Sequence, residues 1–256
     1  MASKQVTDRE KSADSVIAVE THADAIAEAL APTLKRHLKK GQTLPDVALL
    51  VRLLCAELET TKTRLVAADE GHQTELDDDP PARKERDDTA ASLYDTLVQL
   101  REMITGAHGP AISSAVFNGS TPEDPVVLAR FAGEVATRLE KTTFPPSRIK
   151  GAKLDPAALA EDLREKRAHL DRTFKSVQRE VREAQATLAA KDRALAAHDT
   201  CFSSVATTLT GLLHHAGNTD LAAKVRPSTR RPGQTATEAG ETPDPTPATP
   251  SPGTDQ

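Results

Sequence analysis

One segment constrains the fold of this chain more than any other. Residues 157–210 are 54 consecutive positions without proline or glycine, and a heptad repeat runs through all of them. Thirteen of its sixteen core positions are apolar, in the series Ala160, Leu163, Arg167, Leu170, Phe174, Val177, Val181, Ala184, Leu188, Lys191, Leu195, His198, Phe202, Val205, Leu209 and Leu212. A 3.5-residue repeat held this long predicts one continuous helix, about 80 Å in length, with a narrow stripe buried against other helices.

The composition points to helices as well. Apolar residues make up 38% of the chain and aromatic residues only 2%, with no tryptophan. A β-sandwich needs more aromatic and β-branched side chains than this. We therefore expect an all-α fold, an antiparallel helical bundle built around the long coiled-coil-like helix.

Composition and breaker residues divide the chain into five expected segments. These are a disordered arm (1–19), a set of N-terminal helices (20–140), a linker (141–155), the long helix with a terminal turn (156–225) and a disordered Pro/Thr-rich tail (226–256). The tail lacks the large apolar residues that would offset the entropy of ordering it.

Local signals place the ends of individual helices. Asp124-Pro125 and Asp155-Pro156 each combine an Asp N-cap with a proline in the first helical turn. Pro80-Pro81 follows an acidic cluster, and because proline disfavours a helical residue before it, we expect a break there. The helices on either side of this break would begin near Pro45 and cover about 84–106.

The long helix changes character along its length. Its first part has charged flanks and forms an expected interaction seam of Leu163, Leu170, Phe174, Val177, Val181, Leu188 and Leu195. After Asp199 the apolar face widens, which predicts burial on more than one side, against Leu50/Leu54 and Leu93/Leu97. A continuous helix is favoured, although Asp199 could also cap a new one.

Polar residues on the stripe are the first candidates for a site. His198 and Cys201 lie one turn apart, so both could face one metal ion, but two ligands do not make a site. They are weak metal candidates, and no cofactor is expected. Arg167, Lys191 and His198 could instead specify register; the favoured reading is that the long Lys and Arg side chains extend to the edge of the stripe.

Several classes of function are disfavoured. The net charge is −5 and the charges of the long helix are mixed in sign, so we expect no nucleic-acid partner. No segment is apolar enough to span a membrane, and two cysteines without a disulfide framework fit a reduced, cytoplasmic protein. Phosphate-binding glycine loops, nucleophile elbows and zinc motifs do not occur, which argues against an enzyme.

The leading hypothesis is a non-enzymatic helical structural or protein-interaction module. Its partner would be another protein or a second copy of this chain, bound through the seam. The alternative is a metal- or small-molecule-binding regulatory bundle with a pocket near His198, Cys201 and Tyr94.

Overall fold

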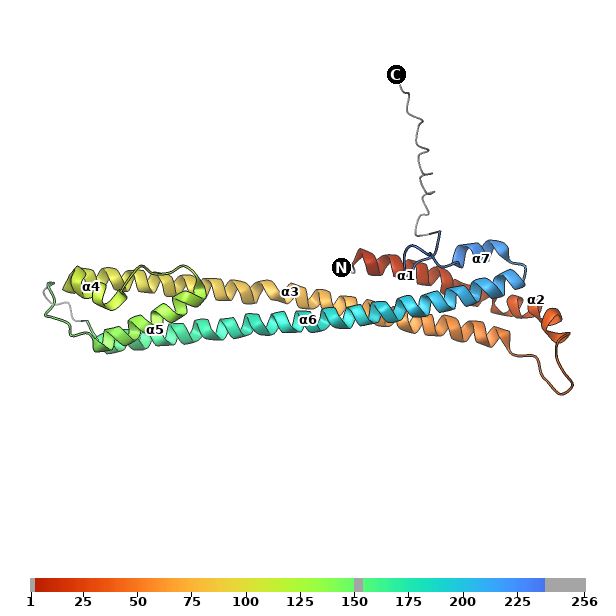
Figure 1. The fold of residues 1–256 in the computed structure, drawn as a ribbon, viewed down its shortest axis with the longest axis horizontal. Coiled ribbons are helices and arrows are strands. Elements are labelled where there is room, and N and C mark those ends of the chain that lie inside the picture. The colour runs from red at the N-terminus through yellow and green to blue at the C-terminus, as the bar shows by residue number, and fades with distance from the viewer. Residues whose placement is uncertain (1–2, 150–153, 238–256) are drawn as a thin grey trace, which may run out of the picture. The chain divides into compact units, whose positions relative to one another are not determined.

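The computed structural model describes residues 3–149 and 154–237, and its regular elements there are helices (Figure 1). Their order is α1 (Lys4–Ile17), the 3-10 helix η1 (Ala18–His22), α2 (Ala23–Lys35), α3 (Val47–His108), α4 (Pro110–Phe117), α5 (Pro125–Lys141), α6 (Pro156–His215) and α7 (Thr219–Val225). The expectation of an all-α bundle around a long heptad-patterned helix is confirmed. That helix is α6, which continues through His198–Thr200 without a joint.

A second long helix, α3, runs through the position where a break was expected. The break at Pro80-Pro81 is wrong, because both prolines lie inside α3. Each proline lacks an N–H and leaves one carbonyl of the preceding turn without its helical partner. The helix nevertheless continues, and it reaches 62 residues against 60 for α6.

A heptad stripe in α3 explains this continuity. Its spacing alternates between three and four residues from Val51 to Ala107, and its phase does not change across the proline pair. Twelve members of the stripe are buried: Val51, Cys55, Leu58, Leu65, Asp69, His72, Ala90, Leu93, Leu97, Leu100, Ile104 and Ala107. Packing on both sides of the prolines thus holds α3 helical.

The N-terminal segment also differs from expectation. Residues 1–19 were expected to form a disordered arm, but residues 4–17 form α1. One face of α1 is buried and carries Val6, Arg9, Ser12, Ala13 and Val16. Two of these five side chains are polar, so the apolar periodicity is too weak to predict the helix.

The two Asp-Pro caps are confirmed. Asp124 accepts hydrogen bonds from the backbone N–H groups of Val126 and Val127, at 3.0 and 2.9 Å. Asp155 accepts in the same way from the N–H groups of Ala157 and Ala158, both at 3.1 Å. These carboxylates satisfy N–H groups that have no partner within the first helical turn.

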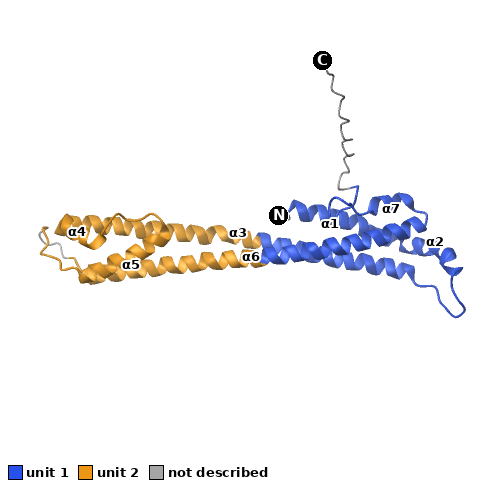
Figure 2. Cartoon of the chain, viewed as in Figure 1, with its two compact units in different colours: residues 1–73, 187–256 blue, residues 74–186 orange. Residues whose placement is uncertain are grey.

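The chain folds into two compact units (Figure 2). Unit 1 contains residues 1–73 and 187–256, and unit 2 contains residues 74–186. In unit 1, α3 and α6 are antiparallel, since Asp69 contacts Lys191 while His72 contacts Thr187. In unit 2 they are antiparallel too, since Thr96 contacts Lys166 and Glu75 lies beside Glu180.

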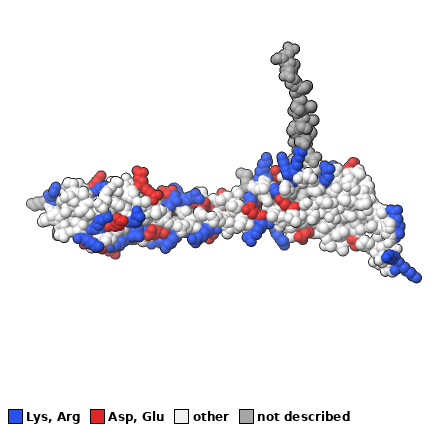
Figure 3. Space-filling view, viewed as in Figure 1, with Lys and Arg blue, Asp and Glu red and all other residues white. Residues whose placement is uncertain are grey.

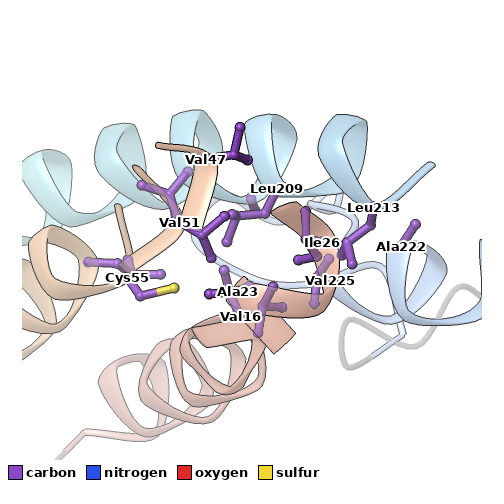
Figure 4. Close-up of a cluster of buried hydrophobic side chains, with 14 of the residues drawn as sticks. Val16, Ala23, Ile26, Val47, Val51, Cys55, Leu209, Leu213, Ala222 and Val225 are labelled. Atoms are coloured by element: carbon purple, nitrogen blue, oxygen red, sulfur yellow. The ribbon is translucent and has the colours of Figure 1, made fainter. Parts of the chain in front are cut away.

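The core of unit 1 is formed where the end of α6 meets α1, α2, α3 and α7. Figure 4 shows labelled side chains from α1 and α2 gathered with those of α3, α6 and α7. Its members include Val16, Ile26, Val51, Leu209 and Val225. The wide apolar face after Asp199 is buried here, as its sequence predicts.

The partners expected for that face are corrected in part. Leu54 packs against the core of unit 1, but Leu50 is 46% exposed. Leu93 and Leu97 belong to the core of unit 2. From α3, Val51, Cys55 and Leu58 also cover this face.

Unit 2 has a separate core. It is built from α3, α4, α5 and the first part of α6, and its largest fully buried side chains include Phe117, Leu128, Leu139, Leu163 and Leu170. None of the described helices is long and apolar enough to cross a membrane.

The first part of the expected disordered tail is folded. Residues 226–237 form a small hairpin-like loop in unit 1, in which Pro227 bridges to Thr235. The N–H of Ser228 donates to the carbonyl of Gln234 at 2.7 Å, and the N–H of Ala236 donates to that of Arg226 at 2.9 Å. The rest of the expected tail, 238–256, lies outside the described residues.

Candidate functional site

The expected seam is covered by the chain itself along its first half. Leu163 and Leu170 are buried in the core of unit 2, and Phe174 packs against that core. Val177 and Leu195 are half-buried. Val181 and Leu188 remain exposed, at 37% and 43% of their surface. Val181 and Leu188 are therefore the apolar residues of the seam that remain exposed.

The polar residue Lys191 has a specific partner on the stripe of α3. Its Nζ lies 2.6 Å from Oδ1 of Asp69, whose side chain is fully buried, while the Lys191 side chain is 13% exposed. Contrary to expectation, the Lys191 side chain does not extend to the solvent edge of the stripe. Arg167 does, because it is exposed and reaches Asp171 only at 3.7 Å.

Asp69 also fixes the start of α1. Its Oδ2 accepts from the backbone N–H of Ser3 at 2.7 Å, and its Oδ1 accepts from the Ser3 hydroxyl at 3.1 Å. Burial opposes ionisation of the carboxyl, but Lys191 and the Ser3 donors outweigh it and lower the pKa of Asp69. The group is thus an ionised anchor with several partners.

A second buried ion pair joins α1 to α6. The guanidinium of Arg9 donates from Nε to Oδ1 of Asp199 at 2.7 Å and from Nη2 to Oδ2 at 2.9 Å. Such a bidentate pair fixes the relative orientation of the two side chains as well as stabilising their charges. The loop of residues 226–237 closes over it, and a Cβ at Gly233, whose φ is +73°, would collide with the Asp199 carboxylate.

His198, a weak metal candidate, lies in the interior of unit 1. It is fully buried with its ring 6.1 Å from that of Phe202, and within the described residues neither ring nitrogen has a hydrogen-bond partner. Burial lowers the pKa of His198, and the positive charges of Arg9 and Lys62 add to this, against the opposing effect of Asp199. The ring is therefore neutral at pH 7.

The cysteines do not complete a metal site with His198. Burial raises the pKa of Cys55 to about 11 and also raises that of Cys201. Among the described residues, neither thiol belongs to a group of three side chains placed to bind a metal. Tyr94, the third residue of the expected pocket, belongs to unit 2.

Unit 2 contains a small acidic cluster on α3 and α6. Carboxylate oxygens of Glu75, Glu180 and Glu183 lie within 4.8 Å of one another. Burial, followed by the charges of Glu183 and Glu180, raises the pKa of Glu75. Arg179 supplies a countercharge, 2.8 Å from Glu180 and 3.8 Å from Glu183.

Unit 2 also has an open groove between α3 and α5, with a volume of about 390 Å³. Its apolar floor consists of Ala90, Ala91, Tyr94, Pro125 and Leu128, and its rim carries Asp87, Asp95 and Glu123. The sequence holds no signal for this groove, because it depends on how α5 packs against α3.

Charges on the visible face of unit 2 are of both signs and interspersed (Figure 3). The groove between α3 and α6 fits this mixture, because it is lined by Lys84 and Lys166 together with Glu85 and Asp88. The groove between α3 and α5 differs in having three carboxylates and no Lys or Arg in its lining.

The comparisons with known proteins add nothing to this geometry. No family model matches the chain, and neither the curated proteins nor the solved structures show a similar sequence or fold.

Proposed function

We propose that the chain is a non-enzymatic helical module that binds another protein or a second copy of itself. The observation that supports this most directly is the exposure of Val181 and Leu188 at core positions of the heptad in α6. Apolar side chains in such a pattern are stabilised by a partner helix that removes them from water. We place this activity in the cytoplasm, where both thiols would stay reduced.

The mass in solution tests self-association. We expect the 27.4 kDa chain to form a dimer at high concentration, with a mass by light scattering near twice that of the monomer. Val181→Glu/Leu188→Glu should shift the equilibrium to the monomer, because a charged residue cannot be buried without a partner at low cost.

A matched variant identifies the surface. Leu50 and Leu53 are also exposed, at 46% and 59%, but lie on α3 outside the stripe. Leu50→Glu/Leu53→Glu should leave the dimer intact. A strict monomer at all concentrations would refute self-association, and dissociation by the α3 variant alone would move the interface away from the stripe.

The alternative, a metal- or small-molecule-binding regulatory bundle, has less support. His198 and Cys201 lie in unit 1 without a third ligand among the described residues, and Arg179 already neutralises part of the acidic cluster in unit 2. Stoichiometric metal in the purified protein, lost in His198→Ala, would favour this alternative over the interaction module.

A further inference from the structure

The groove between α3 and α5 combines apolar and acidic groups in a defined arrangement. Ala90 and Leu128 in its floor are buried, while Tyr94 is half-buried and Ala91 is exposed. Pro125, the first residue of α5, lines the groove as well and is half-buried. The open part of the groove is therefore apolar, and an aliphatic side chain placed there would lose contact with water.

The rim is negative. Asp95 and Glu123 are exposed, and Asp87 is partly neutralised by Arg86, whose Nη2 lies 2.7 Å from Oδ1 of Asp87. The lining itself contains no basic residue. Carboxylates around an apolar floor favour a ligand that carries positive charge on both sides of an apolar side chain.

The spacing of the carboxylates restricts the class of ligand further. Asp87 and Asp95 are eight residues apart on α3, which corresponds to about 12 Å along the helix axis. Ala91 lies midway between them. A helix aligned with α3 would match this spacing with basic residues two turns apart and an apolar residue between them, in the pattern Lys-x₃-Leu-x₃-Lys.

We propose that this groove is a docking site for a basic amphipathic helix of a partner protein. The proposal rests on the proposed function, since it names the class of partner that such a module would bind. The C-terminal residues 238–256 of the chain itself do not have this chemistry, because they contain Glu238, Glu241, Asp244 and Asp255 and no Lys or Arg.

Tyr94 gives a direct measurement of binding. It is the single tyrosine of a chain without tryptophan, so the intrinsic fluorescence of the full-length protein reports on the groove. The probe is a synthetic alanine-based helix with the pattern Lys-x₃-Leu-x₃-Lys and no aromatic residue. We expect a saturable change in Tyr94 fluorescence that weakens as salt is added.

Charge reversal tests the rim. Asp95→Lys/Glu123→Lys should weaken binding of the lysine probe about tenfold and should gain binding of the same peptide with Glu in place of Lys. The matched control is Glu102→Lys/Glu165→Lys, which reverses two exposed carboxylates of unit 2 outside the groove. Its affinity for the lysine probe should stay within about twofold of the original chain. The gain for the glutamate probe also separates a changed groove from a misfolded variant.

Other outcomes overturn the proposal. These are no fluorescence change with the lysine probe, equal binding of both probes by the original chain, or equal loss in the control variant. The mass measurement distinguishes the two hypotheses, because a dimer that ignores the probe would refute the groove and leave the interaction module standing.

Discussion

The buried polar residues of unit 1 differ in whether they have a partner. Asp69 and Lys191 are a compensated pair with further donors from Ser3, whereas His198 has no hydrogen-bond partner for either ring nitrogen among the described residues. Removing one partner of a buried ion pair lowers the free energy of unfolding strongly, because the other charge stays buried without a partner. A buried neutral group without a hydrogen-bond partner resists protonation, because its charged form would be buried and unpaired. The two sites therefore respond differently to substitution and to pH.

Lys191→Met should destabilise the protein by about 3–5 kcal/mol, because it leaves the Asp69 charge buried without its cation. Urea unfolding at pH 7 measures this loss. Lys175→Met, at an exposed position of α6, is the control and should change little. The double variant Asp69→Leu/Lys191→Met should be more stable than Lys191→Met alone; a double variant that is no better would mean that the pair is not the source of the loss.

His198 should make stability depend on pH in the range between its lowered pKa in the folded chain and the ordinary value near 6.5. Its pKa in the folded chain is below the ordinary value near 6.5, so the unfolded chain binds the proton more readily. Its contribution to stability is complete above pH 6.5 and declines as the pH falls toward the folded pKa, by up to about 1.4 kcal/mol per pH unit.

The variant His198→Leu should remove this part of the pH dependence in urea unfolding. His169→Gln changes an exposed histidine and should retain it. If the two variants show the same pH profile as the original chain, His198 does not control acid sensitivity.

At the scale of elements, α3 is the helix with the strongest conflict between local and tertiary preference. Pro80 and Pro81 oppose the helix, and the buried stripe on both sides supports it. Tertiary packing prevails, as it often does over intrinsic propensity.

Pro80→Ala/Pro81→Ala should stabilise the protein, by as much as about 3 kcal/mol per proline, because both positions are exposed and inside a helix. Thermal unfolding followed by circular dichroism measures the gain. Pro110→Ala is the matched control, since Pro110 begins α4, where a proline costs no hydrogen bond. A loss of stability in the double alanine variant would show that the prolines favour the native backbone.

Elements with local signals could be predicted from the sequence. The starts of α5 and α6 follow from Asp-Pro caps, and the length of α6 follows from its heptad. The continuity of α3 was also encoded, in a stripe whose phase survives the proline pair, but polar residues such as Asp79, Arg83 and Arg86 occupy that stripe near the prolines. The stripe is therefore visible only when polar members are counted.

Features that depend on distant partners could not be predicted. The face of α1 contains Arg9 and Ser12, which become suitable for burial only beside Asp199 and the N–H of Thr235. The loop 226–237 is folded for the same reason, since it rests on α1. The acidic groove needs α3 and α5 together, and no spacing within either helix reveals it.

At the scale of the whole molecule, the two hydrophobic cores share no residue. Each unit can therefore lose stability without direct loss of packing in the other. Leu97→Ala removes a fully buried side chain from unit 2 and should cost about 2–5 kcal/mol.

Hydrogen exchange measured along the chain tests this separation. In Leu97→Ala the amides of α4 and α5 should exchange faster, while those of α2 and α7 should change less. Leu58→Ala, in the core of unit 1, should give the reverse pattern. Equal acceleration everywhere would show that the molecule opens as one cooperative body.

The division of the sequence between the units bears on how the chain folds during its synthesis. Unit 2 is one continuous segment in the middle of the sequence, residues 74–186, so its core can fold while translation continues. Unit 1 needs α6 residues such as Phe202 and Leu209, which follow much later than α1 to α3. At roughly 5–20 residues per second, about ten seconds pass before α6 can cover its side of Val51, Cys55 and Leu58. The nascent chain thus offers an apolar helix face to chaperones throughout that interval.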